Sequence, residues 1–72
     1  MKRILLIDDN ESIRRMIKRI FSDYDFEFEE AENIKNGIEL LEEMNFDLII
    51  TDLKLPDGEG TQILKKRNEK NM

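Results

Sequence analysis

Cysteine and histidine are absent from the 72 residues of this chain, and proline occurs only once. Without cysteine the protein has neither disulfides nor thiolate metal sites. Without histidine it has no imidazole ligand for zinc, no histidine general base and no Ser–His catalytic pair. These absences leave carboxylates as the candidate metal ligands, and a carboxylate site favours a hard cation.

Long apolar runs and an excess of positive charge are also missing. No apolar run approaches the length that spans a membrane, and no signal-peptide pattern opens the chain, so we expect a cytoplasmic protein without membrane association. The formal net charge of -5 argues against nucleic acid as the main partner. The length allows one small domain of marginal stability, because a short chain buries a smaller share of its surface than a long one.

Two unbroken apolar runs are present, and each of them ends in carboxylates. Ile4–Ile7 is followed by Asp8 and Asp9, and Leu48–Ile50 is followed, after one threonine, by Asp52. Branched apolar residues without alternation are typical of strands that are covered on both faces, as in parallel sheets. Both runs are therefore expected to be buried strands of one sheet.

Between these runs the sequence predicts two helices and one further strand. Residues 26–31 alternate in polarity, as in an edge strand. Asn33 is the expected N-cap of a helix with Ile34, Ile38 and Leu41 on its inner face. The first helix follows Asn10, and its apolar stripe is expected to face the sheet, with Arg14, Arg15 and Lys18 off the stripe. That stripe is Ile13, Met16, Ile17, Ile20 and Phe21.

The order strand–helix–strand–helix–strand predicts an α/β fold of three layers, with right-handed crossovers and a parallel sheet. In a flavodoxin-like arrangement the strand order is 2-1-3, and ligands bind where the winding reverses, at the carboxyl ends of the first and third strands. Asp8, Asp9 and Asp52 would meet there. Three carboxylates repel one another unless a cation lies between them, which predicts a magnesium site.

A loop and a short helix complete the chain. Pro56 and two glycines mark a tight loop after Asp52, in which Asp57–Gly58 is interpreted as a turn without a ligand role. An EF-hand is rejected, because lysine and proline occupy its ligand positions. The last helix is expected from about Glu59 to Arg67, with the usual uncertainty in its ends.

These residues resemble the receiver domain of bacterial two-component response regulators over the whole chain, as three of the family's strand–helix units within residues 1–72. The matching segments are Ile4–Asn10, Glu30–Asn33 and Asp47–Gly60. The last segment is the most specific. An aspartate after a buried strand, with proline four residues later and glycine eight residues later, is the family's phosphoacceptor signature.

The resemblance implies a role for each acid. Asp52 would be the phosphoacceptor, Asp9 would bind Mg²⁺ directly, and Asp8 would act mainly through a bound water. Lys54 would offer its backbone carbonyl to the metal. The family takes a phosphoryl group from a histidine kinase. The resemblance therefore implies a signalling module and not an enzyme. The exposed side of the first helix contacts the kinase in that family, so Arg14, Arg15 and Lys18 are candidate partner contacts.

The sequence also departs from the family, which has five strand–helix units. The family's Thr or Ser on its fourth strand and Lys on its fifth have no counterpart here, which leaves the acidic, metal-binding half of the site. One alternative is a fold fragment that self-assembles without phosphotransfer. Another is a phosphatase of the haloacid dehalogenase kind, ranked last because it requires an acid at position 54.

The third strand predicts an assembly. In the resembled fold this strand is interior, so here Asp47 to Thr51 would leave backbone N–H and C=O groups unpaired along an apolar edge. We expect a two-fold homodimer in which residues 47–51 pair with their mates in a six-stranded sheet. Exchange of the third strand and last helix between chains is the second arrangement considered.

Overall fold

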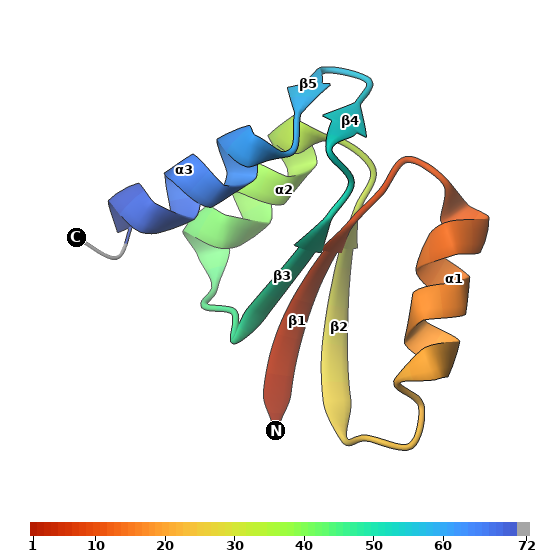
Figure 1. The fold of residues 1–72 in the computed structure, drawn as a ribbon. Coiled ribbons are helices and arrows are strands. Elements are labelled where there is room, and N and C mark those ends of the chain that lie inside the picture. The colour runs from red at the N-terminus through yellow and green to blue at the C-terminus, as the bar shows by residue number, and fades with distance from the viewer. Residues whose placement is uncertain (71–72) are drawn as a thin grey trace.

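The computed structural model describes residues 1–70 (Figure 1). They form a parallel sheet with one helix on one face and two helices on the other, which are the predicted three layers of an α/β fold. The elements are β1 (Lys2–Ile7), α1 (Glu11–Ile20), β2 (Phe26–Ala31), α2 (Ile34–Glu43), β3 (Leu48–Thr51), β4 (Lys54–Leu55), β5 (Gly58–Glu59) and α3 (Thr61–Lys70).

The sheet has the order β2-β1-β3, and both pairings are parallel. The predicted order 2-1-3 is therefore confirmed. Ile7 is the last residue of β1, and it is paired with Ala31 of β2 and Thr51 of β3. The three strands thus end level with one another, and the residues that follow them lie along one edge of the sheet.

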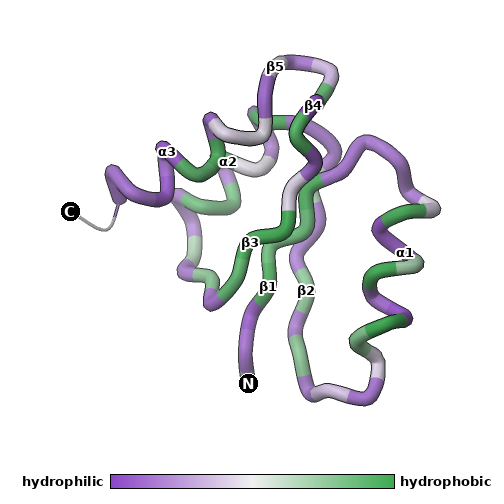
Figure 2. The backbone as a smooth tube through the Cα atoms, viewed as in Figure 1, coloured by the Kyte–Doolittle hydropathy of each residue, from purple (hydrophilic) through white to green (hydrophobic). Residues whose placement is uncertain are grey.

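The face covered by α2 and α3 holds the main core. Figure 2 shows apolar segments of β1, β3 and α2 converging there. Gly37 lets α2 lie close to the sheet, because an added Cβ would be 2.8 Å from Cδ1 of Ile7 and 3.0 Å from Cδ1 of Ile63. The buried core residues are Leu5, Ile7, Ala31, Ile34, Leu41, Leu55 and Ile63.

The α1 face differs from the prediction. Met16 is 51% exposed and Ile20 is 63% exposed, so the expectation that the whole stripe packs on the sheet was wrong. Ile13 and Ile17 are half-buried, whereas Arg14, expected off the stripe, is buried. The reason is that the guanidinium of Arg14 is held beside the sheet by Glu30 and by the backbone carbonyl of Asp8. With Arg14 buried, Met16 and Ile20 on the opposite side of the stripe face solvent.

A small antiparallel hairpin, β4–β5, replaces the predicted loop after Asp52. Leu55 is buried and anchors the hairpin in the core, while Gly58 has a φ of 150°, a conformation that side chains other than glycine rarely adopt. The hairpin uses residues to Glu59, so the last helix starts later than predicted, at Thr61, and extends to Lys70. No helix among residues 1–70 is long and apolar enough to cross a membrane.

Candidate metal and phosphoacceptor site

The structure brings three carboxylates together at the carboxyl edge of the sheet. Asp8 and Asp9 follow β1, and Asp52 follows β3. Each offers a carboxylate oxygen, and these oxygens all lie within 4.8 Å of one another. The convergence that the strand ends predicted is present, at the point between β1 and β3 where the winding of the sheet reverses.

Backbone hydrogen bonds extend the sheet to this cluster. The Asp52 amide donates to the carbonyl oxygen of Ile7 at 3.0 Å, and the Asp8 amide donates to that of Ala31 at 3.1 Å. The two main chains that carry the acids are thereby fixed to neighbouring strands. The positions of Asp8 and Asp52 relative to each other therefore follow from strand pairing and do not depend on a flexible loop.

The turn between β1 and α1 is also ordered by side chains. The carboxylate of Asp8 accepts from the Asn10 amide at 2.9 Å. The Asn10 side chain in turn accepts from the amides of Ser12 at 2.9 Å and Ile13 at 3.4 Å, which confirms it as the N-cap of α1. Asp9, between them, is exposed and free to face a ligand.

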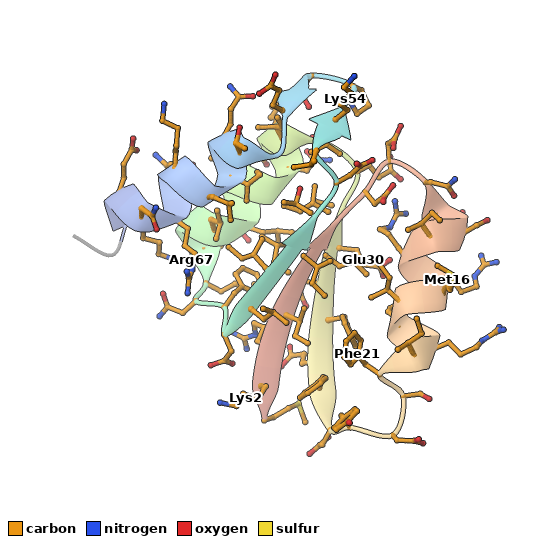
Figure 3. All side chains as sticks on the ribbon, viewed as in Figure 1. Lys2, Met16, Phe21, Glu30, Lys54 and Arg67 are labelled. Atoms are coloured by element: carbon orange, nitrogen blue, oxygen red, sulfur yellow. The ribbon has the colours of Figure 1, made fainter. Side chains whose placement is uncertain are left out.

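Lys54 lies beside Asp52, at the start of the hairpin (Figure 3). Its backbone N–H donates to the carboxylate of Asp52 at 3.4 Å, a long hydrogen bond. Lys54 is exposed, so its side chain is not a buried cation that neutralises the three carboxylates. The role implied for its backbone carbonyl stays a prediction.

Gly60 is the glycine of the signature, and its surroundings explain why this position has no side chain. Its amide donates to the carbonyl oxygen of Leu53 at 2.9 Å, which brings its Cα against the backbone after β3. A Cβ at this position would overlap the carbonyl oxygen of Asp52 and lie 2.9 Å from Oγ1 of Thr51. A residue with a side chain would therefore push the backbone of Asp52 out of place.

Asp57 has a structural role that the sequence did not reveal. Its carboxylate accepts from the amides of Ile34 at 2.8 Å and Lys35 at 3.0 Å, so it caps the N-terminus of α2 from the hairpin. The hydrogen bond from Ile34 is the main reason that the pKa of Asp57 is lowered. Asp-Gly after proline has the form of an ordinary turn, and nothing in the local sequence indicates a helix 23 residues earlier.

Arg14 is the second residue whose role the sequence missed. Its guanidinium donates to the backbone carbonyl oxygen of Asp8 and, through Nε, to Glu30 at 3.0 Å. It also lies 3.7 Å from the carboxylate of Glu32. A buried arginine is not available as a kinase contact on the helix surface, so that expectation was wrong for Arg14. Arg15 remains exposed and pairs with Glu11 at 3.3 Å.

Lys18 completes the polar group on this side of the sheet. Its ammonium pairs with Glu30 at 2.8 Å, and Figure 3 shows Glu30 between β2 and α1. The pKa of Glu30 is lowered, first by the hydrogen bond from Lys18 and then by that from Arg14, against the opposing effect of burial. The only signal in the sequence was the acidic stretch from Asp23 to Glu32, which contains no basic residue.

The donor set fits magnesium. Mg²⁺ prefers carboxylate oxygens and retains several waters, and the cluster is open to solvent because Asp9 and Asp52 are exposed. Within residues 1–70 no salt bridge includes Asp8, Asp9 or Asp52. The negative charge of the cluster is therefore not compensated by an arginine or lysine ion pair, which leaves the three carboxylates free to bind a divalent cation.

Comparison with known proteins agrees with the fold. Residues 4–72 match the model of the response regulator receiver domain. The chain is 39% identical over 66 residues to the transcriptional regulatory protein SrrA of Staphylococcus aureus. This alignment covers 92% of this chain and 27% of SrrA. The chain thus spans about a quarter of that relative.

Solved receiver domains have the same architecture. The receiver domain of a putative Luxo repressor protein from Vibrio parahaemolyticus superposes with a TM-score of 0.90 at 31% identity, over 97% of this chain and 54% of that one. A structure of the histidine kinase ThkA in complex with the response regulator TrrA matches with a TM-score of 0.77 at 34% identity, over 97% and 60% of the two chains. Sequence similarity and fold agree, and this chain belongs to the response regulator receiver domain family.

Proposed function

We propose that Asp52 is the phosphoacceptor of this receiver domain and that the chain acts as a regulatory module of a two-component phosphorelay. The observation that carries the proposal is the convergence of Asp8, Asp9 and Asp52 without an ion-pair partner. A carboxylate oxygen of Asp52 would attack the phosphorus of a phosphohistidine, and the bond from phosphorus to the imidazole nitrogen would break. The nitrogen keeps the bonding electrons and is protonated as it leaves.

In this proposal Asp9 would hold magnesium directly and Asp8 through a water, and Asp52 and the backbone carbonyl of Lys54 would be the remaining protein ligands. Magnesium held there would supply positive charge that offsets the repulsion between the acceptor carboxylate and the phosphoryl oxygens. The chain itself supplies the alignment. Strand pairing places Asp52 against Ile7, and Gly60 leaves room for its backbone.

We expect phosphotransfer from a small donor to be slow. The Thr or Ser and the Lys that the family places on its fourth and fifth strands have no counterpart in these 72 residues. Each missing charge-assisted contact to the phosphoryl oxygens should cost about 1.5–3 kcal/mol. Incubation with Mg²⁺ and acetyl phosphate, followed by intact-mass analysis, would measure the modification. Rapid, stoichiometric phosphorylation would contradict an incomplete site.

The metal site is tested by titration of the protein with Mg²⁺. We expect millimolar affinity, roughly -4 kcal/mol, because the cluster is open to water. Asp52→Asn should weaken binding strongly. Asp23→Asn is the matched control, because Asp23 is an exposed acid in the turn before β2, at the opposite end of the sheet. Equal Mg²⁺ affinity of the two variants would reject the proposed site.

The proposed partner is a histidine kinase or a phosphotransfer protein. The complex of ThkA with TrrA shows that a response regulator similar to this chain associates with a kinase. On this chain the surface of α1 offers Arg15, which is exposed, and Met16, which is 51% exposed. Arg15→Glu should weaken binding to a cognate kinase, measured by phosphotransfer from the phosphorylated kinase, and leave Mg²⁺ affinity unchanged.

We also propose the two-fold dimer through β3. Within residues 1–70 β3 pairs only with β1, and Leu48 is 47% exposed. Beside β3 is an open groove of about 440 Å³ in which Ile50 faces Ile13 and Ile17 of α1. Antiparallel pairing of residues 47–51 across the two-fold axis would provide hydrogen-bond partners for the backbone N–H and C=O groups on the outer edge of β3. It would also narrow this groove.

Sedimentation at micromolar concentrations tests the dimer. Leu48→Lys should convert it to a monomer, because a charge would then lie directly on the paired edge. Ile49 is a poor choice for this test, since it packs against the core and its replacement would destabilise the monomer as well. A wild-type protein that sediments as a monomer at high micromolar concentration would rule out the dimer.

A further inference from the structure

Arg14 joins three parts of the chain at one guanidinium. It belongs to α1, it donates to the carbonyl oxygen of Asp8 in the turn after β1, and it pairs with Glu30 of β2. The residue is only 7% exposed. A buried guanidinium is costly unless its donors are satisfied, so these contacts decide where the group lies.

The peptide that Arg14 holds is the one that links Asp8 to Asp9. Its carbonyl accepts from Arg14, while the Asp8 amide on the other side donates to Ala31 at 3.1 Å. The Asp8 backbone is thus held on both sides. A rotation of the Asp8–Asp9 peptide would swing both carboxylates, whose oxygens lie within 4.8 Å of each other and of Asp52.

Glu30 fixes Arg14 in turn. Its two carboxylate oxygens are divided, one accepting from Arg14 at 3.0 Å and the other from Lys18 at 2.8 Å. Glu32 adds a second acid at 3.7 Å from the guanidinium. The hydrogen bond from Lys18 is the main reason that the pKa of Glu30 is lowered, which reflects how the two cations favour its ionised form.

We propose that Arg14 is a positioning residue for the magnesium site: it holds the Asp8 carbonyl, and thereby orients the carboxylates of Asp8 and Asp9, while Glu30 orients Arg14. The inference rests on the metal site proposed above. It assigns a function in the site to a residue that contacts neither the metal nor the phosphoryl group. Partners that orient metal ligands from behind typically change metal affinity 10–100-fold, roughly, when they are removed.

The test is a Mg²⁺ titration of Arg14→Met, with Lys18→Met as the matched control. Both variants remove one cation from Glu30, but only Arg14→Met removes the contact to Asp8. We expect Arg14→Met to raise the Kd for Mg²⁺ about tenfold or more. Lys18→Met should change the Kd less than about twofold, since Asp8 and Asp9 keep their orientation in that variant.

A double-mutant cycle separates positioning from a general loss of structure. In a background of Asp9→Asn, Arg14→Met should raise the Kd by a smaller factor than in the wild type, because the direct ligand that Arg14 positions is already impaired. The amide resonance of Asp9 should shift in Arg14→Met and remain in place in Lys18→Met. Equal effects of the two methionine variants, or full additivity with Asp9→Asn, would overturn the inference.

Arg14→Lys covers the case in which Arg14→Met does not fold. Lysine keeps the charge, but its single ammonium lacks the fork of donors that reaches both Asp8 and Glu30, so the Kd should still rise. An unchanged Kd in folded Arg14→Lys would overturn the inference. If Asp52→Asn abolishes Mg²⁺ binding and the Arg14 variants bind normally, only this inference fails. If Asp52→Asn has no effect, the proposed metal site itself fails.

Discussion

The two faces of the sheet are stabilised by different kinds of contact. On the α2–α3 face the buried residues are apolar, and Ile63 and Leu41 are almost completely shielded from solvent. On the α1 face the buried side chain of the helix is Arg14, while Met16 and Ile20 are exposed. Both faces remove apolar surface of β1 from water, since Leu6 beside α1 is fully buried, but the α1 face adds directional polar contacts around Arg14.

The capping of the helices shows the same contrast. Charged side chains from the segment after β3 cap both ends of α2. Asp57 accepts from the first amides of α2, and Lys70 donates to the carbonyl oxygen of Met44 at 2.8 Å. α1 is capped by its own Asn10 and joined to β2 through Glu30. The α2–α3 face should thus unfold as one unit with the hairpin, whereas the contact of α1 with β2 includes ion pairs that respond to pH and salt.

The largest effect is expected in the apolar face. Ile63→Ala should lower the free energy of unfolding by about 2–5 kcal/mol, because it removes a fully buried side chain between α3, α2 and β1. Met16→Ala on the exposed side of α1 should change it by less than about 0.5 kcal/mol. Urea denaturation followed by circular dichroism measures both. Similar losses would mean that the two faces contribute equally.

Gly60→Ala should follow, at about 1–3 kcal/mol, because the new methyl group would meet the fixed backbone of Asp52. Gly37→Ala is its control on α2, where the methyl group would meet side-chain atoms of Ile7 and Ile63 and no backbone atom. Alanine also favours the helix at that position. Gly60→Ala should therefore lose more stability, and it alone should weaken Mg²⁺ binding. Equal losses would contradict the steric role of Gly60.

Asp57→Ala should destabilise the protein by removing the charged cap of α2. The folded-state pKa of Asp57 lies below its usual value of 3.8, so the contribution is present above that pH and is lost as the pH falls. Hydrogen exchange should show faster opening of the first turn of α2. Mg²⁺ affinity that falls as much as in Asp52→Asn would show that Asp57 belongs to the metal site.

Glu30→Gln should give a small change in stability, up to about 1 kcal/mol, because the carboxylate is partly exposed and its ion pairs are screened. The pKa of Glu30 is lowered in the folded state, so its stabilising effect is complete above its usual value of 4.5 and disappears as the pH falls below it. The melting temperatures of the variant and the wild type, measured between about pH 7 and pH 3, should therefore converge at low pH. The pH range follows from the lowered pKa of Glu30. Curves that stay parallel would exclude this role of Glu30.

Much of the site followed from the sequence, because its elements are local. The apolar runs before Asp8 and Asp52 predicted parallel strands, and parallel strands with level ends bring the acids that follow them together. Asn10 and Asn33 were recognised as caps, since a cap and its helix are neighbours in sequence. The hairpin was missed because its two-residue strands are too short to show a period.

Arg14 and Asp57 show where sequence reasoning ends. The helical stripe predicted which residues share a side of α1, but its rotation was set by Glu30 and the Asp8 carbonyl, which reach Arg14 only after β2 has paired with β1. Asp57 became a cap only because the hairpin folds onto α2. The sequence by itself determined the strands, their parallel order and the acids at their ends, through local periodicity. Tertiary structure decided which charges are buried and what they hold, because a charge in the interior lies wherever its distant partners are brought to it.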